Sequence, residues 1–168
     1  MNKRSRTYAA RRCAAGQSLV LVAVVLPVVL AFVLTCVEVG TRLLQRAEVE
    51  DALRAASRTA IQTFVYAPFA EGMTAVRTED VRRIATHTFA TNLAQAHGLT
   101  TSPAETAAAV HWEPITNTNV PCLAPNGQAV VVTPPALCAT VQLRMQGFIG
   151  WGEWRSTLFV AETLDQVR

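Results

Sequence analysis

The chain has 168 residues, of which 51% are hydrophobic and 16% charged, with 15 lysines and arginines against 12 aspartates and glutamates. The apolar fraction excludes a wholly disordered chain, and the length allows about one domain. Five basic residues and no acidic one lie in the first twelve positions: Lys3, Arg4, Arg6, Arg11 and Arg12. The remaining 156 residues carry 10 basic and 12 acidic side chains. Because a nucleic-acid-binding protein carries its positive charge on the folded body, we expect no nucleic-acid partner.

A stretch without charge, residues 13–37, follows the basic cluster, and its centre at 19–37 is almost entirely Leu, Val, Ala and Phe. In a helix this centre spans roughly 28 Å, close to the hydrocarbon thickness of a bilayer. The basic residues before it and Glu38 after it predict a cytoplasmic N-terminus and an exported body. The apolar run is longer than a signal-peptide core and lacks a small-x-small site, so we expect it to stay attached. Pro27 predicts a kink of the kind that helices in lipid tolerate.

Several features of this region keep a fixed spacing. A proline, Pro27, stands eleven residues after Gly16, and an acidic residue, Glu38, precedes Gly40 by two positions. A stretch rich in Arg, Gln and Ala follows at 41–63. This arrangement resembles the N-terminus of TadE/TadG-like pseudopilins, the minor pilin-like subunits of tight-adherence (Flp) pili within the type IV pilus class. The resemblance implies a lipid-anchored subunit whose partners are other pilin or pseudopilin subunits, an inner-membrane platform protein and a prepilin peptidase.

One position departs from the family pattern. Processed members carry Glu five residues after the glycine, whereas this chain has Leu21. A charged side chain at mid-bilayer costs about 2.5–3.5 kcal/mol, so it persists only where a partner needs it. Two interpretations follow. Either a prepilin peptidase cuts between Gly16 and Gln17 and the subunit caps or primes a filament without that charge, or the chain stays an unprocessed single-pass protein.

Four parts are predicted along the chain: a basic cytoplasmic leader at 1–16, a transmembrane helix at 17–39, an amphipathic stalk helix at 40–66 and an exported domain at 67–168. Apolar residues recur along the stalk at three- and four-residue spacing, which is typical of a helix with one buried face. These residues are Leu43, Leu44, Ala47, Val49, Leu53, Ala56, Ala60 and Ile61.

The transmembrane and stalk segments are expected to form one helix of roughly 45 residues, at 17–63, because no breaker separates them. The alternative is a membrane helix followed by a separate amphipathic one. Pro68 and Gly72 are expected to end the helical pattern.

The exported part changes character along its length. A second helix is expected from Thr78 to a stop at Gly98, and Ser102 with Glu105 has the spacing of a capping box. Beyond residue 108 alternating and β-rich runs predict strands, at 110–113, 129–132, 140–146 and 156–162. Val141, Leu143 and Met145 are expected on the buried face of the third. Helices first and antiparallel strands last predict an α+β fold.

Cys122 and Cys138 flank a loop rich in Pro, Gly and Val. In an exported domain they are expected to form a disulfide, the alternative being two free thiols in a cytosolic body. The three histidines, His87, His97 and His111, lack metal-ligand spacing, so we expect no metal site.

No nucleotide-binding or hydrolase motif is present, so we expect no enzyme, cofactor or small-molecule substrate. The glycine-flanked aromatic residues Phe148, Trp151 and Trp154 predict either an exposed binding tip or side chains folded back on the core. The sequence therefore favours a pilus-assembly subunit, with an unprocessed membrane-anchored binding module of the cell envelope as the alternative. A membrane-tethered enzyme is the least favoured interpretation.

Overall fold

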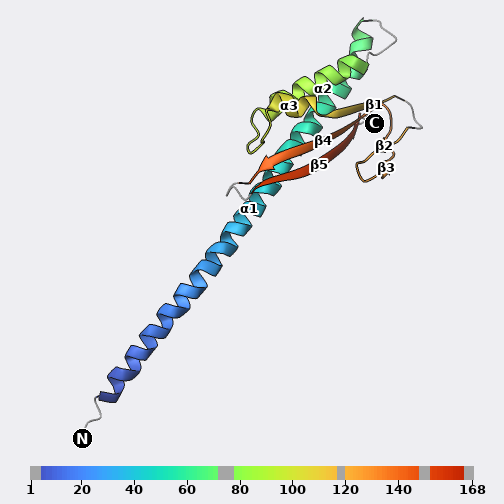
Figure 1. Ribbon diagram of the computed structural model, residues 1–168. Helices are drawn as coiled ribbons and strands as arrows, with labels where there is room; N and C mark the ends of the chain where they lie inside the picture. Colours follow the sequence, from blue (N-terminus) through green and yellow to red (C-terminus); the bar gives the residue numbers. More distant parts are fainter. Residues whose placement is uncertain (1–4, 72–77, 117–119, 148–151, 165–168) are drawn as a thin grey trace. The chain divides into compact units, whose positions relative to one another are not determined.

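The computed structural model (Figure 1) describes residues 5–71, 78–116, 120–147 and 152–164. It divides into two compact units, residues 1–40 and 41–168. Among the described residues helices come first and strands follow, which confirms the predicted α+β class. The elements are α1 (Ser5–Glu71), α2 (Thr78–Leu93), α3 (Pro103–Ala108), β1 (His111–Ile115), β2 (Cys122–Leu123), β3 (Ala129–Val130), β4 (Ala136–Gln146) and β5 (Glu153–Thr163).

Helix α1 is one uninterrupted helix of 67 residues, so the alternative of two separate helices is wrong. It also extends beyond the predicted span at both ends. The extension at the start is rich in Ala and Arg, both good helix formers. At the other end α1 continues through Pro68 to Glu71, where we had expected a break. A proline at this position lacks the N–H that would bond to the carbonyl four residues earlier, so the helix continues to Glu71 without that hydrogen bond.

Helix α2 buries the face that the 3.6-residue period predicts. Val81, Ala85, Phe89 and Leu93 lie four residues apart and are 0–3% exposed. Glu79 and Asp80 occupy its first turn, where they complement the helix dipole. The helix ends at Leu93, earlier than predicted, and the chain then turns before Gly98, which has a φ of 81°.

The capping box of α3 is confirmed. The Ser102 hydroxyl accepts a hydrogen bond from the Glu105 amide at 3.2 Å, and a Glu105 carboxylate oxygen accepts one from the Ser102 amide at 3.1 Å. Pro103 takes the first helical position, where its missing N–H costs nothing.

The main sheet has the antiparallel order β1-β4-β5, and a separate two-stranded sheet joins β2 to β3. The predicted strand at 129–132 contributes only its first two residues, as β3. Strand β5 begins at Glu153 instead of Ser156, so Trp154 lies opposite Met145 inside the sheet. The connection after β4 is therefore shorter than predicted, because pairing with the long strand β4 extends β5 toward it.

Pro114 lies within β1, one residue beyond the end of the strand predicted at 110–113. Backbone groups of Arg144 and Gln146 on β4 bond to Thr100 and Gly98, on the side away from β5. The backbone N–H and C=O groups of successive residues alternate in direction along a strand, so those of Leu137, an odd-numbered residue, point toward β5. Pro114 pairs with Leu137, and its own backbone groups therefore point away from β4, outward from the edge of the sheet. The N–H that proline lacks is therefore one that the sheet does not use, as is typical of edge strands.

Two apolar clusters form on opposite faces of the sheet. The larger joins α1, α2 and the face of β4 that carries Val141, Leu143 and Met145, each at most 1% exposed as predicted. Phe89 and Trp112 meet in it edge to face, with ring centroids 6.3 Å apart. The smaller cluster contains Ile115, Cys122, Ala136 and Cys138, with Phe159 and Ala161 of β5 packed against it.

Candidate functional site

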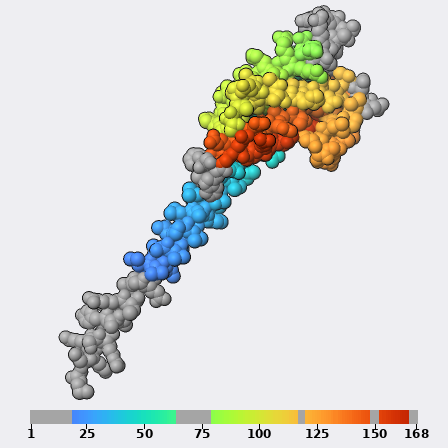
Figure 2. Space-filling model, in the orientation of Figure 1, coloured from blue at the N-terminus to red at the C-terminus, as the bar shows by residue number. Residues whose placement is uncertain are grey.

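Every residue from 19 to 37 is exposed, and Figure 2 shows one uncovered face of this part of α1. The exposed fraction of its large hydrophobic side chains runs from 44% at Val37 to 72% at Leu19. An 18-residue window of this helix has a mean hydropathy of 3.1 and no buried part. Water strongly disfavours so long an apolar surface, whereas a bilayer accepts it. The helix is therefore long and apolar enough to serve as a single-pass membrane anchor.

Two residues near the end of the apolar segment, Thr35 and Cys36, carry polar side-chain groups. The Thr35 hydroxyl donates to the Ala31 carbonyl at 2.8 Å, which suits a side chain in lipid. Cys36 is an exposed free thiol. The helix continues through Pro27, and the kink predicted there stays a prediction.

The family-pattern positions differ in their surroundings. Gly16 and Gln17 lie within α1, and cleavage between them stays a prediction. Leu21 is 62% exposed, whereas the Glu38 side chain is buried. A Cβ atom at Gly40 would meet no other atom within 4 Å. Since a glycine inside a helix costs about 1 kcal/mol relative to alanine, packing within the described chain does not account for Gly40.

The stalk part of α1 packs one face against the body, but this face is not quite the predicted one. Val49, Leu53, Ala56, Ala60 and Ile61 are buried as expected. Leu43 and Leu44 are 62% and 68% exposed, and the polar side chain of Gln45 is buried instead.

Gln45 is the residue that sequence reasoning missed. It lies against Gly98: a Cβ atom at Gly98 would collide with the Gln45 side-chain amide. Its position on the helix could have revealed it, because Gln45 precedes Val49 by four positions and so lies on the same buried face, one turn earlier.

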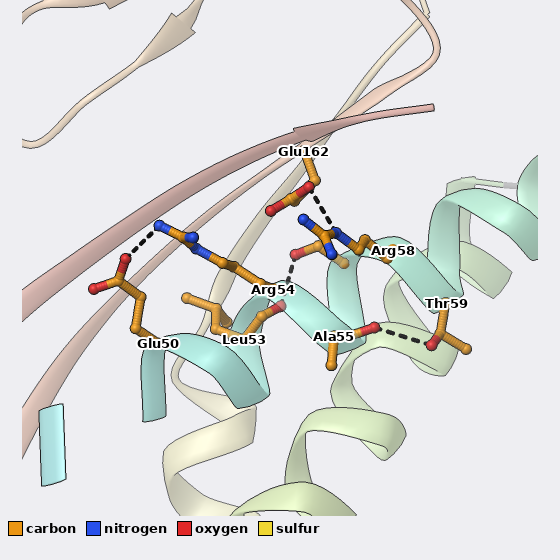
Figure 3. A network of polar contacts seen from close by, with 8 residues as sticks. Glu50, Leu53, Arg54, Ala55, Arg58, Thr59 and Glu162 are labelled. Atoms are coloured by element: carbon orange, nitrogen blue, oxygen red, sulfur yellow. Dashed lines mark hydrogen bonds and ion pairs between the residues drawn. The ribbon is translucent and has the colours of Figure 1, made fainter. Parts of the chain in front are cut away.

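Polar contacts run along the stalk and join it to β5 (Figure 3). Arg58 of α1 donates to a Glu162 carboxylate oxygen at 3.0 Å, and Arg54 pairs with Glu50 one turn away at 2.6 Å. The Ser57 hydroxyl, which is fully buried, donates to the Leu53 carbonyl at 2.9 Å. Surface ion pairs such as these two contribute at most about 1 kcal/mol each to stability.

Cys122 of β2 and Cys138 of β4 form a disulfide, with their Cα atoms 5.9 Å apart. Both side chains are buried in the smaller cluster. The bond therefore holds the β2–β3 hairpin against the outer face of the main sheet. In the chain-entropy model a loop of this length contributes about 3 kcal/mol.

Trp154 does not belong to an exposed tip. Its side chain is partly buried and packs against the larger cluster, because its place on β5 directs it to the same face as Leu158 and Val160. This favours the core interpretation for Trp154. Phe148 and Trp151 lie outside the described residues.

The histidines are exposed and scattered. His87 lines an open hollow of about 280 Å³ on α2 together with Arg83, Ile84 and Thr88. Within the described ranges no three or more His, Cys, Asp or Glu side chains gather as a metal site would require.

The exposed apolar helix, continuous with a stalk that packs on a small α+β body, is the arrangement that the resemblance implies. Residues 16–58 match the family model for TadE-like proteins. The TadE-like segment thus begins at Gly16 and ends on the stalk, and it contains Pro27, Glu38 and Gly40. Neither the curated proteins nor the solved structures contain a match to the chain.

Proposed function

We propose that this chain is a membrane-anchored, minor pilin-like subunit that takes part in assembling a Tad/Flp-type pilus or a related secretion system. The observation that carries the proposal is the match of residues 16–58 to the TadE-like family over an apolar helix with no buried side chain in residues 19–37. In this proposal the helix packs among other pilin-like helices, and the basic leader stays cytoplasmic while the body is exported.

The proposed partners are the lipid bilayer, pilin or pseudopilin subunits, an inner-membrane platform protein and a prepilin peptidase. The role is structural and needs no catalysis. The predicted parts, a leader at 1–16, a membrane helix at 17–39, a stalk at 40–66 and an exported domain at 67–168, belong to the same proposal.

Gly40 supports an assembly role. It lies in a helix, where glycine is unfavourable, and nothing described around it fills the space of a side chain. A glycine at such a place permits the close approach of a neighbouring helix. We therefore propose that Gly40 contacts another subunit.

The test is to delete the gene in its host and measure piliation and secretion after complementation. The wild-type chain is expected to restore both, and Gly40→Leu to restore membrane insertion but not assembly. Gln62→Leu is the matched control, since Gln62 is an exposed α1 residue beyond the TadE-like segment. Unchanged piliation and secretion in the deletion strain would rule the proposal out.

The alternative is an unprocessed, membrane-anchored binding module of the cell envelope. Leu21 favours it, because the carboxylate of processed family members is replaced there by an exposed leucine. Sequencing the N-terminus of the mature protein separates the two forms: a chain that begins at Gln17 is processed, and one that begins at Met1 is not.

A further inference from the structure

One end of the second unit brings together the start of the stalk and the far end of the sheet. The Gln45 side chain lies against Gly98, and the Gly98 carbonyl accepts from the Gln146 amide at 2.8 Å. Thr100 donates to the Arg144 carbonyl at 3.1 Å, one step along β4. We call this end the collar and define it as residues 41–46, 144–147 and 152–155.

Charge is divided unevenly between the collar and the rest of the second unit. The collar carries four arginines against one glutamate, a net charge of +3: Arg42, Arg46, Arg144, Arg155 and Glu153. The remainder of residues 41–168 carries six basic and ten acidic side chains, a net charge of −4. When the charge of Glu38, which lies just before the collar, is added, the net charge is still +2. The net charge of the collar is therefore opposite in sign to that of the rest of the unit.

Three of the four collar arginines, at positions 46, 144 and 155, are exposed. The side chains of Arg144 and Arg155 are 55% and 74% exposed, and both approach one carboxylate, that of Glu153, at 3.7 and 3.9 Å. One carboxylate shared at these distances leaves a positive surface. Arg46 is exposed as well, and beside it the leucines at 43 and 44 are 62% and 68% exposed. Adjacent exposed leucines and arginines are typical of segments that lie at a membrane surface.

Chain connectivity keeps this surface near the apolar segment. Helix α1 is continuous, and Leu43 follows Val39 by four residues, which is about 6 Å at helical rise. That distance is shorter than the Debye length of about 8 Å at physiological ionic strength, so the part of the collar on α1 lies within electrostatic reach of lipid phosphates at the end of the apolar segment.

We infer that the collar binds the headgroups of anionic phospholipids in the membrane that α1 enters. The exposed leucines extend the apolar surface into the headgroup layer, and the arginines pair with phosphates. This inference rests on the membrane anchor and not on the assembly role, so either can fail without the other. The contact holds the body against the membrane before any partner binds.

The test uses the full-length protein in nanodiscs of phosphatidylcholine alone and of an equal mixture with phosphatidylglycerol. Hydrogen exchange is followed at the backbone amides of 142–147 and 152–157. An arginine near an anionic surface contributes about fivefold to binding, so three give on the order of 100-fold. We expect collar amides to exchange at least about tenfold more slowly in the anionic nanodiscs. Salt at about 1 M shortens the Debye length to about 3 Å and is expected to remove the effect.

The triple variant Arg46→Gln, Arg144→Gln, Arg155→Gln is expected to exchange at the same rate in both lipids. Its matched control is Arg54→Gln, Arg82→Gln, Arg83→Gln, which removes the same charge from exposed positions outside the collar and is expected to keep the protection. Equal exchange of the wild-type collar in the two lipids overturns the inference without recourse to any variant. Protection that inorganic phosphate reproduces in phosphatidylcholine nanodiscs also overturns it, since the collar would then bind free anions.

Discussion

The two compact units use similar side chains in opposite ways. In residues 19–37 the leucines, valines and phenylalanine are all exposed, whereas the larger cluster of the body holds leucines, valines and a phenylalanine that are only 0–8% exposed. The apolar segment depends on a surrounding lipid phase for its stability, and the body makes its own apolar interior. The same substitution made once in each unit therefore separates the contribution of the body's own apolar interior to stability from that of the surrounding lipid.

A pair of phenylalanines gives the largest expected contrast. Phe89→Ala removes a fully buried ring that contacts Trp112, and we expect the free energy of unfolding of the body to fall by about 3–5 kcal/mol. Phe32→Ala, at a side chain that is 69% exposed, is expected to leave it within about 0.5 kcal/mol. Urea unfolding in detergent, followed by near-UV circular dichroism, measures both. Equal losses would contradict the division into two units.

Cysteines provide a second pair. Cys122→Ser is expected to lower the unfolding free energy of the body by about 3 kcal/mol, because it opens a 16-residue loop. Cys36→Ser removes an exposed free thiol and is expected to have no effect. The same urea titration with and without reductant is the measurement. A wild-type protein that is insensitive to reductant would contradict the disulfide's role.

Glycines form a third pair. Gly98→Ala places a Cβ atom against Gln45 at a φ of 81°, and we expect a loss of about 2 kcal/mol. Gly40→Ala meets open space in a helix and is expected not to lower stability, because alanine is the better helix former. Thermal unfolding of the two variants measures both changes in stability. A stable Gly98→Ala protein would show that Gln45 moves aside at little cost.

The smallest effect concerns pH. The Ser102 amide and hydroxyl hold the pKa of Glu105 below its usual value of 4.5. A lowered pKa means that the folded state binds the proton less tightly than the unfolded state. The capping box therefore contributes its full stability above about pH 4.5 and loses it as the pH falls through the lowered pKa. In Glu105→Gln this part of the acid dependence should disappear, as measured by Tm between pH 6 and pH 3.

Sequence patterns predicted most of the fold, and the errors have physical causes. The apolar segment, the buried face of α2 and the capping box of α3 depend on residues close together in the chain, so the sequence predicted them. The exposure of Leu43 and Leu44 was not predicted, because helical periodicity alone does not show at which residue the body begins to cover the stalk. The predicted limits of the first and last strands excluded Pro114 and Trp154 for a related reason: pairing with β4 decides these limits, and the pattern within one run of residues does not show that pairing.

The candidate site was predicted unevenly. The TadE-like segment was recognised from Gly16, Pro27, Glu38 and Gly40, whose spacing is local. The collar was not, since it joins residues about 100 positions apart through Gly98 and becomes visible only when the sheet is formed.

The position of the disulfide links folding to cellular location. Both cysteines belong to the smaller cluster, so the outer layer of the sheet is complete only where thiols oxidise. A body left on the reducing side of the membrane keeps its larger cluster but lacks the cross-link that secures the hairpin. In the proposed topology such a molecule would differ from an exported one in the oxidation state of these two sulfurs, which would record on which side of the membrane the body matured.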